Sequence, residues 1–115
     1  MNHRFVSEIA ADGPDSAVSR YTWTEADCDG HFPGNPVVPG VKMLAMAAQT
    51  AFAADGGSFS GIERMLFKMS VRPGETVACR AQLRDGGRAA DVELKFAGGP
   101  KDVEVILSGR ILGGK

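Results

Sequence analysis

The chain has few of the residues that build covalent or metal-bound frameworks. Its 115 residues include 2 histidines and 2 cysteines, Cys28 and Cys79. Two cysteines are too few for a disulfide framework, so we expect reduced thiols in a cytoplasmic protein. Cys28 and His31 have the spacing of metal ligands, but a structural zinc ion needs four ligands. The sequence therefore implies no metal and no redox cofactor.

An excess of charge of one sign is also missing. The net charge is -1, from 13 Lys and Arg against 14 Asp and Glu, and the basic residues form no cluster. Binding of nucleic acid or of an anionic membrane surface needs such a cluster, so we expect neither. Residues 1–15 lack the apolar segment of a signal peptide, and no repeat or linker follows. We expect one domain, residues 1–115, that oligomerisation would help to stabilise.

One apolar run is long enough for a helix and too short to span a bilayer. Residues 41–54 are all Val, Met, Leu, Ala or Phe except Lys42, Gln49 and Thr50. Ala, Met and Leu favour helix, and neither Gly nor Pro interrupts the run. A helix that is apolar on nearly every side must be enclosed by other elements. The sequence predicts a buried helix here.

The rest of the chain alternates apolar and polar residues, as half-buried antiparallel strands do. We expect strands in the segments 4–10, 16–24, 61–70, 75–84, 88–98 and 102–112. Val103, Val105 and Leu107 would share one face of the last strand. Asp85-Gly86-Gly87 and Gly98-Gly99-Pro100 would form tight hairpin turns. The economical α+β arrangement is a curved sheet of five or six strands wrapped around one helix that follows the second strand, which is the hotdog fold.

A conformationally restricted segment precedes the predicted helix. Residues 30–40 read GHFPGNPVVPG, with three prolines that fix φ and three glycines that admit unusual backbone angles. This composition excludes regular helix or strand. We interpret the segment as a loop of one fixed shape that presents His31.

Residues 30–49, GHFPGNPVVPGVKMLAMAAQ, resemble the active-site motif GHFPGxPVxPGVLxxEAxAQ of the 3-hydroxyacyl-[acyl-carrier-protein] dehydratases. Residues 61–77, GIERMLFKMSVRPGETV, are similar to the strand and turn that follow the helix in that family. The resemblance is good from about residue 24 to residue 84 and looser towards the C-terminus. It implies a hotdog dehydratase of fatty-acid or polyketide-type metabolism, acting on thioesters of acyl carrier protein or coenzyme A.

The resemblance also assigns roles. His31 would remove the C2 proton of a 3-hydroxyacyl thioester, a task that suits an imidazole. The backbone N–H groups of Gly40 and Val41, at a helix N-terminus, would bind the thioester oxygen as it gains negative charge. Contacts to substrate would come from Phe32, Pro33, Gly34, Val38 and Gln49.

The family's second catalytic group is missing. It is a Glu or Asp fourteen residues after the histidine, and that position holds Ala45. A methyl group cannot donate a proton to the departing hydroxyl, and loss of a general acid typically costs about 10²–10⁴-fold in rate. Lys42 is a further departure, because the family usually has Leu there; it would either face solvent or attract an acidic carrier protein.

Several substitutes for this acid are conceivable. Glu25, Asp27 and Asp29 lie just before His31, although a solvated turn is the simpler interpretation of these residues. In the family the two catalytic residues come from different subunits of a dimer, so an intact partner subunit would supply the carboxylate in a heterodimer. A homodimer remains the other assembly. Two other functions stay open: a hotdog thioesterase, and a non-catalytic subunit that binds acyl carrier protein.

Overall fold

The computed structural model describes residues 5–6, 9–28, 34, 36–52 and 58–114. These residues form a six-stranded antiparallel sheet and one α-helix, which confirms the expected hotdog fold. The strands are β1 (Ile9–Ala11), β2 (Ser16–Thr22), β3 (Ser58–Phe67), β4 (Thr76–Arg84), β5 (Ala89–Phe96) and β6 (Val105–Gly114). The helix is α1 (Gly40–Phe52), and two 3-10 turns are η1 (Glu25–Cys28) and η3 (Asp85–Gly87).

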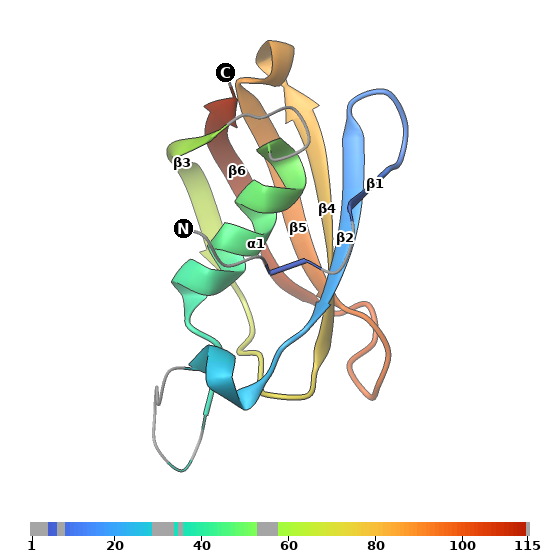
Figure 1. Ribbon diagram of the computed structural model, residues 1–115, viewed down its shortest axis with the longest axis vertical. Coiled ribbons are helices and arrows are strands. Elements are labelled where there is room, and N and C mark those ends of the chain that lie inside the picture. Colours follow the sequence, from blue (N-terminus) through green and yellow to red (C-terminus); the bar gives the residue numbers. More distant parts are fainter. Residues whose placement is uncertain (1–4, 7–8, 29–33, 35, 53–57, 115) are drawn as a thin grey trace.

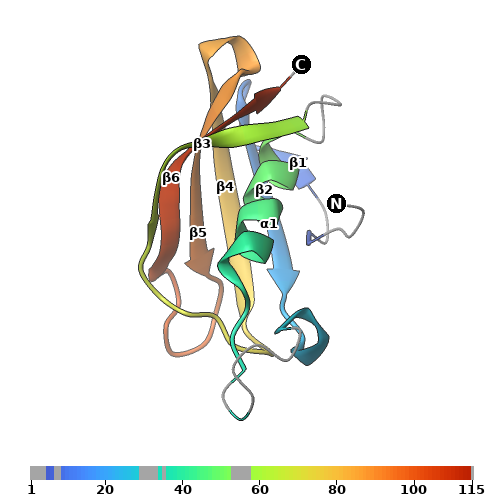
Figure 2. The ribbon, with the colours of Figure 1, turned by 90° about the vertical axis from the view of Figure 1, so that its left-hand side faces the viewer.

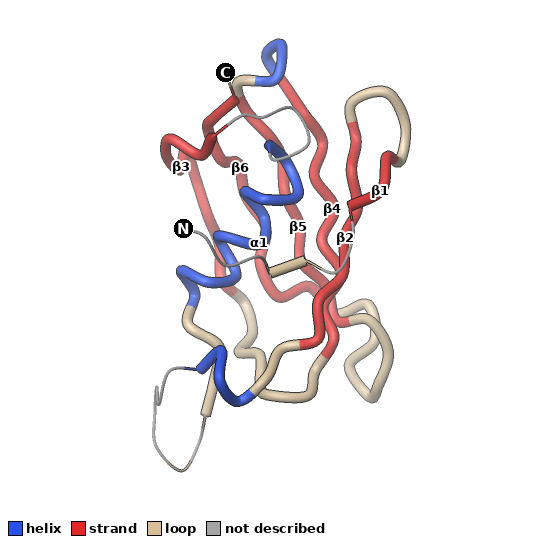
Figure 3. The backbone as a smooth tube through the Cα atoms, viewed as in Figure 1, coloured by secondary structure: helices blue, strands red, loops and turns tan. Residues whose placement is uncertain are grey.

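The sheet has the strand order β1-β2-β4-β5-β6-β3, so β1 and β3 are its edges. Helix α1 follows β2 in the chain and lies against one face of the sheet (Figure 1). In the view turned by 90° the sheet curves around the helix (Figure 2), and Figure 3 shows the strands as a continuous layer behind it. No helix in the described part of the chain has the length and hydrophobicity needed to cross a bilayer.

The core lies between α1 and the concave face of the sheet. Val77, Cys79 and Ala81 of β4 are buried, while Arg80 between them is exposed, as a period of two requires. The helix buries Met46 completely against this face. On β6, Gly109 has no space for a Cβ atom because the backbone oxygen of Arg64 lies against it, so glycine permits the close approach of β3.

Several expectations about strand ends are wrong. Strand β2 ends at Thr22 rather than at residue 24, and β3 spans Ser58–Phe67 rather than residues 61–70. Strand β6 begins at Val105 rather than at residue 102, and Val103 lies in a turn with φ +61° and 66% of its surface exposed. The connection from β5 is wider than a tight Gly-Gly-Pro turn, because Val103 donates to the carbonyl of Phe96 at 2.9 Å and Gly98 donates to the Asp102 carboxylate at 2.6 Å. The first strand, expected over residues 4–10, is limited in the described residues to Ile9–Ala11.

Candidate functional site

The N-terminal end of α1 carries two free backbone donors. The N–H groups of Lys42 and Met43 both donate to the carbonyl of Pro39, at 3.0 and 3.4 Å. Gly40 and Val41 precede them in the first turn, and within the described residues neither of their N–H groups donates a hydrogen bond. Val41 is 63% exposed. Unpaired N–H groups at the positive end of a helix dipole can donate to a negatively charged oxygen, and the role expected for Gly40 and Val41 stays a prediction.

The first residue of α1 is packed against the end of β3. A Cβ atom on Gly40 would lie 3.1 Å from Cε1 of Phe67, which is tighter than ordinary van der Waals contact. Gly40 does not have a positive φ, so its small size is what this position requires. The Phe67 ring itself is half exposed beside the two donors.

The loop that precedes α1 is fixed at its exit. The N–H of Val38 donates to the carbonyl of Val71 at 2.8 Å, and the Val38 side chain is only 4% exposed in the core. Strand β2 is tied to the same segment, because Trp23 donates to the carbonyl of Glu75 at 3.1 Å and accepts from Gly74 at 2.7 Å. These bonds join the end of β2, the loop exit and the β3–β4 connection.

Three of the residues expected at the site, His31, Phe32 and Pro33, lie outside the described residues, as does Asp29. Gly34 is exposed with φ +83°, a conformation that favours glycine. The assigned roles of these residues remain predictions. The structure describes the frame on either side of them.

Asp27 belongs to that frame and is not solvated. Its side chain is 6% exposed, and its Oδ2 accepts from the N–H and hydroxyl of Thr24, at 2.9 and 3.0 Å, and from the Tyr21 hydroxyl at 3.0 Å. The solvated turn expected here is therefore wrong for Asp27 and holds for the exposed Glu25. Burial, together with the Asp27 carboxylate, raises the pKa of Tyr21 to about 12. Thr24-Glu25-Ala26-Asp27 matches the capping-box pattern, which could have predicted this arrangement.

Lys42 points towards η1. Its Nζ donates to the backbone carbonyl of Asp27 at 2.7 Å, and the side chain is half-buried. Neither a purely solvent-facing lysine nor a freely projecting docking charge describes this placement. No sequence signal identified the contact, because it joins positions fifteen residues apart through a loop.

The missing-acid position and Gln49 lie one turn apart on α1. Ala45 is half-buried and packs against the hydrophobic core. Gln49 is also half-buried, and its Oε1 accepts from the N–H of Phe5 at 2.7 Å. Phe5 is 2% exposed and stacks on Trp23 with ring centroids 5.2 Å apart, a contact that sequence reasoning missed.

A buried polar cluster lies further along α1. Ser19 and Thr50 share a hydrogen bond of 2.6 Å, and Thr50 donates to the carbonyl of Met46 at 2.8 Å. Burial raises the pKa of the neighbouring Cys79 thiol to about 12, partly offset by hydrogen bonds from Thr50 and Ser19. Both cysteines are buried and neither forms a disulfide. Cys79 is a neutral thiol and an unsuitable nucleophile at neutral pH. Among the described residues no three His, Cys, Asp or Glu side chains come together as metal ligands do.

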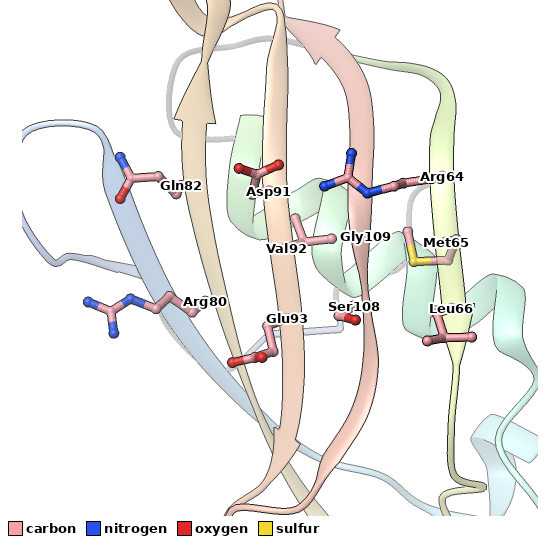
Figure 4. Close-up of a pocket in the computed structure, with 10 residues that line it drawn as sticks. All are labelled: Arg64, Met65, Leu66, Arg80, Gln82, Asp91, Val92, Glu93, Ser108 and Gly109. Atoms are coloured by element: carbon pink, nitrogen blue, oxygen red, sulfur yellow. The ribbon is translucent and has the colours of Figure 1, made fainter.

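A hollow of about 540 Å³ lies on the face of the sheet opposite α1 (Figure 4). It is lined by Arg64, Met65, Leu66, Arg80, Gln82, Asp91, Val92, Glu93, Ser108 and Gly109. Its charged groups are paired: Asp91 accepts from Arg110 at 2.7 and 3.2 Å and from Arg84 at 3.0 Å. These bonds, that of Arg110 foremost, hold the pKa of Asp91 below its ordinary value. This surface is a satisfied ion-pair network on the far side of the sheet from the helix N-terminus.

Comparisons with known proteins agree with the fold and with the resemblance to the dehydratases. A 3-hydroxyacyl-[acyl-carrier-protein] dehydratase FabZ from Acetivibrio thermocellus is 35% identical over 104 residues, covering 70% of this chain and 71% of the relative. The dehydratase heterocomplex ApeI:P from Xenorhabdus doucetiae contains a chain with the same fold, at a TM-score of 0.77 and 21% identity over 98% of this chain and 99% of that one.

The fold also occurs in hydrolases. A thioesterase from Haemophilus influenzae matches at a TM-score of 0.66 and 19% identity, covering 92% of this chain and 75% of that chain. The ApeI-like family model, described as ApeI dehydratase, matches residues 20–110, from the end of β2 through the loop, α1, β3, β4 and β5 to the first part of β6. The chain belongs to the ApeI-like dehydratase family.

Proposed function

We propose that the site removes water from a 3-hydroxyacyl thioester, with His31 as the base that takes the C2 proton. The C3–O bond then breaks, the C2–C3 double bond forms, and the hydroxyl leaves as water after it receives a proton. The thioester oxygen, which gains negative charge in this step, accepts from the N–H groups of Gly40 and Val41. The observation that carries the proposal is this pair of unpaired donors, on the last residue of an intact GHFPGNPVVPG segment and on the residue that follows it.

The acyl group is carried, in this proposal, by an acyl carrier protein, as the names of the FabZ relatives state for those enzymes. Such a substrate fits the cytoplasmic location expected from the sequence. Gly34 and the undescribed Phe32 and Pro33 would contact the acyl thioester. Val38 would act by fixing the loop exit, since its side chain is buried. Gln49 would orient the substrate through its amide group.

The proton for the leaving hydroxyl has to come from outside this chain's helix. Ala45 offers only a methyl group, and the Oδ2 atom of Asp27 already accepts three hydrogen bonds that hold η1 in place. A second copy of the chain would bring another Ala45. We therefore propose a heterodimer in which a hotdog subunit with an intact Glu or Asp completes the site, as the existence of the ApeI:P heterocomplex also suggests.

Strand β3 is the surface that suits this partner. It is an edge strand of 10 residues beside α1, with no further strand on its outer side among the described residues. Ile62, Leu66 and Phe59 expose 47%, 56% and 42% of their surface along it, and Val41 on the helix is exposed nearby. Long apolar edges pair readily with another chain, whereas strands that stay single are usually shortened or charged.

A complementation experiment tests the reaction and the shared site together. Wild-type chain and the double variant His31→Ala/Ala45→Glu are each assayed alone, and then after mixing and refolding, with 3-hydroxyoctanoyl-carrier protein as substrate. We expect little turnover from either chain alone and at least about 10²-fold more from the mixture, because only a mixed dimer pairs His31 with a carboxylate. His31→Ala/Ala48→Glu, with the acid at a neighbouring half-buried alanine, is the control. Full activity of the wild-type chain alone would contradict the heterodimer, and silence of the mixture would contradict the reaction.

Thioester hydrolysis is the second candidate. Ala45 favours it, because hydrolysis needs a base, a water molecule and the two N–H donors but no acid at this position. The thioesterase neighbours have the same fold. If the assays above release free carrier thiol and form no 2-enoyl product, the reaction of this site is thioester hydrolysis and not dehydration.

A further inference from the structure

The hydrogen bond between Lys42 and Asp27 connects the two ends of the segment that carries His31. Lys42 lies in the first turn of α1, and Asp27 lies in η1, immediately before that segment. The 2.7 Å bond from Lys42 Nζ to the Asp27 carbonyl closes the chain between them into a clamped loop. Figure 1 shows η1 beside the start of α1, at the same end of the molecule.

We propose that Lys42 is a positioning residue for the reaction: its ammonium group fixes where the His31 loop begins relative to the N–H donors of Gly40 and Val41. The inference rests on the proposed function, and it adds a residue that the family resemblance does not assign. Lys42 would touch neither substrate nor reacting atoms. It would act through the loop.

The acceptor of this bond is rigid. Asp27 is buried, and its carboxylate is held by Thr24 and by the hydroxyl of Tyr21 on β2. The N–H of Asp27 donates in turn to the carbonyl of Thr24 at 3.1 Å. Because the Asp27 carbonyl is anchored to β2 in this way, a group that binds it is held at a fixed distance from that strand. Lys42 therefore ties α1 to β2 through η1.

The lysine is unfavourable for the helix itself. A cation in the first turn opposes the helix dipole, at a typical cost of about 0.3–1 kcal/mol, and half-burial removes part of its hydration. The bond to the Asp27 carbonyl offsets these costs. Helix stability therefore does not explain a lysine at this position. The tertiary bond that it makes to η1 does.

The two ends of the loop differ in what fixes them. The exit is held by the bond from Val38 N–H to the Val71 carbonyl and by the buried Val38 side chain, and neither involves Lys42. The entry is held to α1 by the side chain of Lys42. Removing that side chain should loosen the entry of the loop while the helix, the sheet and the exit remain.

Misplacement of a catalytic group by about 1 Å can cost roughly 10²-fold in rate without changing ground-state binding. We therefore expect Lys42→Met, in the chain assembled with its partner or in the Ala45→Glu background, to lower kcat by about 10–10²-fold with KM within twofold. The pH profile of kcat should shift, since the surroundings of His31 change. Lys42→Arg keeps a charged donor and should recover most of the activity. Lys95→Met, the same substitution on the opposite face of the sheet, is the control.

Two readouts separate this inference from the alternatives. If Lys42 instead attracts an acidic carrier protein, Lys42→Met will raise KM in a salt-dependent way and leave kcat unchanged, which overturns the positioning role. Amide hydrogen exchange of peptides covering residues 28–38 gives a measurement that does not need activity: we expect faster exchange in Lys42→Met and not in Lys95→Met. Unchanged exchange would overturn the clamp. Faster exchange in a protein that shows no dehydration in any assembly would support the clamp and overturn the proposed function alone.

Discussion

The backbone N–H of Phe5 donates to the side-chain oxygen of Gln49 at 2.7 Å, across 44 positions of the chain. This bond holds the N-terminal segment against α1, one turn beyond Ala45. The Phe5 ring is then buried between β2 and the helix, where it stacks on Trp23 and meets Tyr21 edge-on at 5.8 Å. The side of the helix that faces β2 is thereby closed by an aromatic cluster.

Phe5→Ala should lower the free energy of unfolding by about 3 kcal/mol, as truncation of a buried phenylalanine typically does. The hydrogen bond to Gln49 uses the backbone N–H and survives the substitution, so the loss reports on the ring alone. The fluorescence of Trp23, the chain's single tryptophan, follows urea unfolding and so measures the loss in free energy. Phe59→Ala, at a ring that is 42% exposed, is the control, expected within about 0.5 kcal/mol of the wild type. Equal losses in the two variants would contradict the burial of Phe5.

Asp27→Asn should lower the pKa of Tyr21 from about 12 towards its ordinary value of 10.0. Burial is the larger cause and remains in the variant, so the shift should be only partly removed. The chain has 1 tyrosine, so tyrosinate absorbance reports on this residue without correction. Glu25→Gln, an exposed carboxylate in the same turn, is the control and should leave the titration unchanged. A wild-type titration near 10 would contradict the buried contact with Asp27.

The raised pKa of Tyr21 also gives a pH dependence of stability. The folded-state pKa of about 12 lies above the ordinary tyrosine value of 10.0, so above pH 10 the folded chain keeps a proton that the unfolded chain loses. Stability from this group is therefore complete below about pH 10 and declines as the pH rises towards 12. Urea midpoints measured across this interval should fall less steeply in Tyr21→Phe than in the wild type.

Alkylating reagents should leave both cysteines unmodified while the chain is folded. Cys28 and Cys79 are each only 1% exposed, so the reagent cannot reach either sulfur. The pKa of Cys79 is about 12, so almost no reactive thiolate forms there at pH 8. Labelling rates followed by intact mass should track the rate of unfolding. Ser70→Cys, at an exposed position after β3, supplies a thiol that should react at once. Rapid labelling of the wild type would contradict the packing around the Ser19–Thr50 bond.

Sequence periodicity predicted most of the fold because burial on one face of the sheet is regular. The alternation in β4 and β5 placed Val77, Cys79 and Leu94 inward. The uninterrupted apolar run 41–54 predicted the start of α1 to within one residue, while residues 53–54 lie outside the described residues. The pattern failed in β6, where a register shift opposite Leu94 and Lys95 makes both Ile106 and Leu107 buried. Local hydrogen bonds of the preceding turn, and not hydrophobicity, decide where that strand starts.

The sequence predicted only those parts of the site that are formed by residues adjacent in the chain. Gly40 and Val41 follow the Pro39 carbonyl directly, so the free donors could be located from the order of residues. Lys42 and Phe5 act through partners that are distant in the chain, and single-sequence patterns carry no information on such pairs. Asp27 was misjudged because acidic residues before a loop are usually solvated, whereas here the capping bonds to Thr24 bury the carboxylate.

Ile62→Lys should weaken association of the chain by at least about tenfold in Kd, if β3 is the edge that meets the partner. Ile62 is 47% exposed and pairs with the buried Ile111, so it lies on the side of β3 that faces α1. A lysine there would place a charge in the centre of an apolar contact and would also prevent edge-to-edge pairing.

Val103→Lys adds the same charge at a more exposed valine in the β5–β6 turn, away from this edge, and should leave association unchanged. Sedimentation equilibrium of the chain and of the mixed subunits measures both, and loss of complementation together with dissociation is expected only for Ile62→Lys. Identical behaviour of the two lysine variants would remove β3 as the interface and would require the carboxylate partner to approach from another side of the helix.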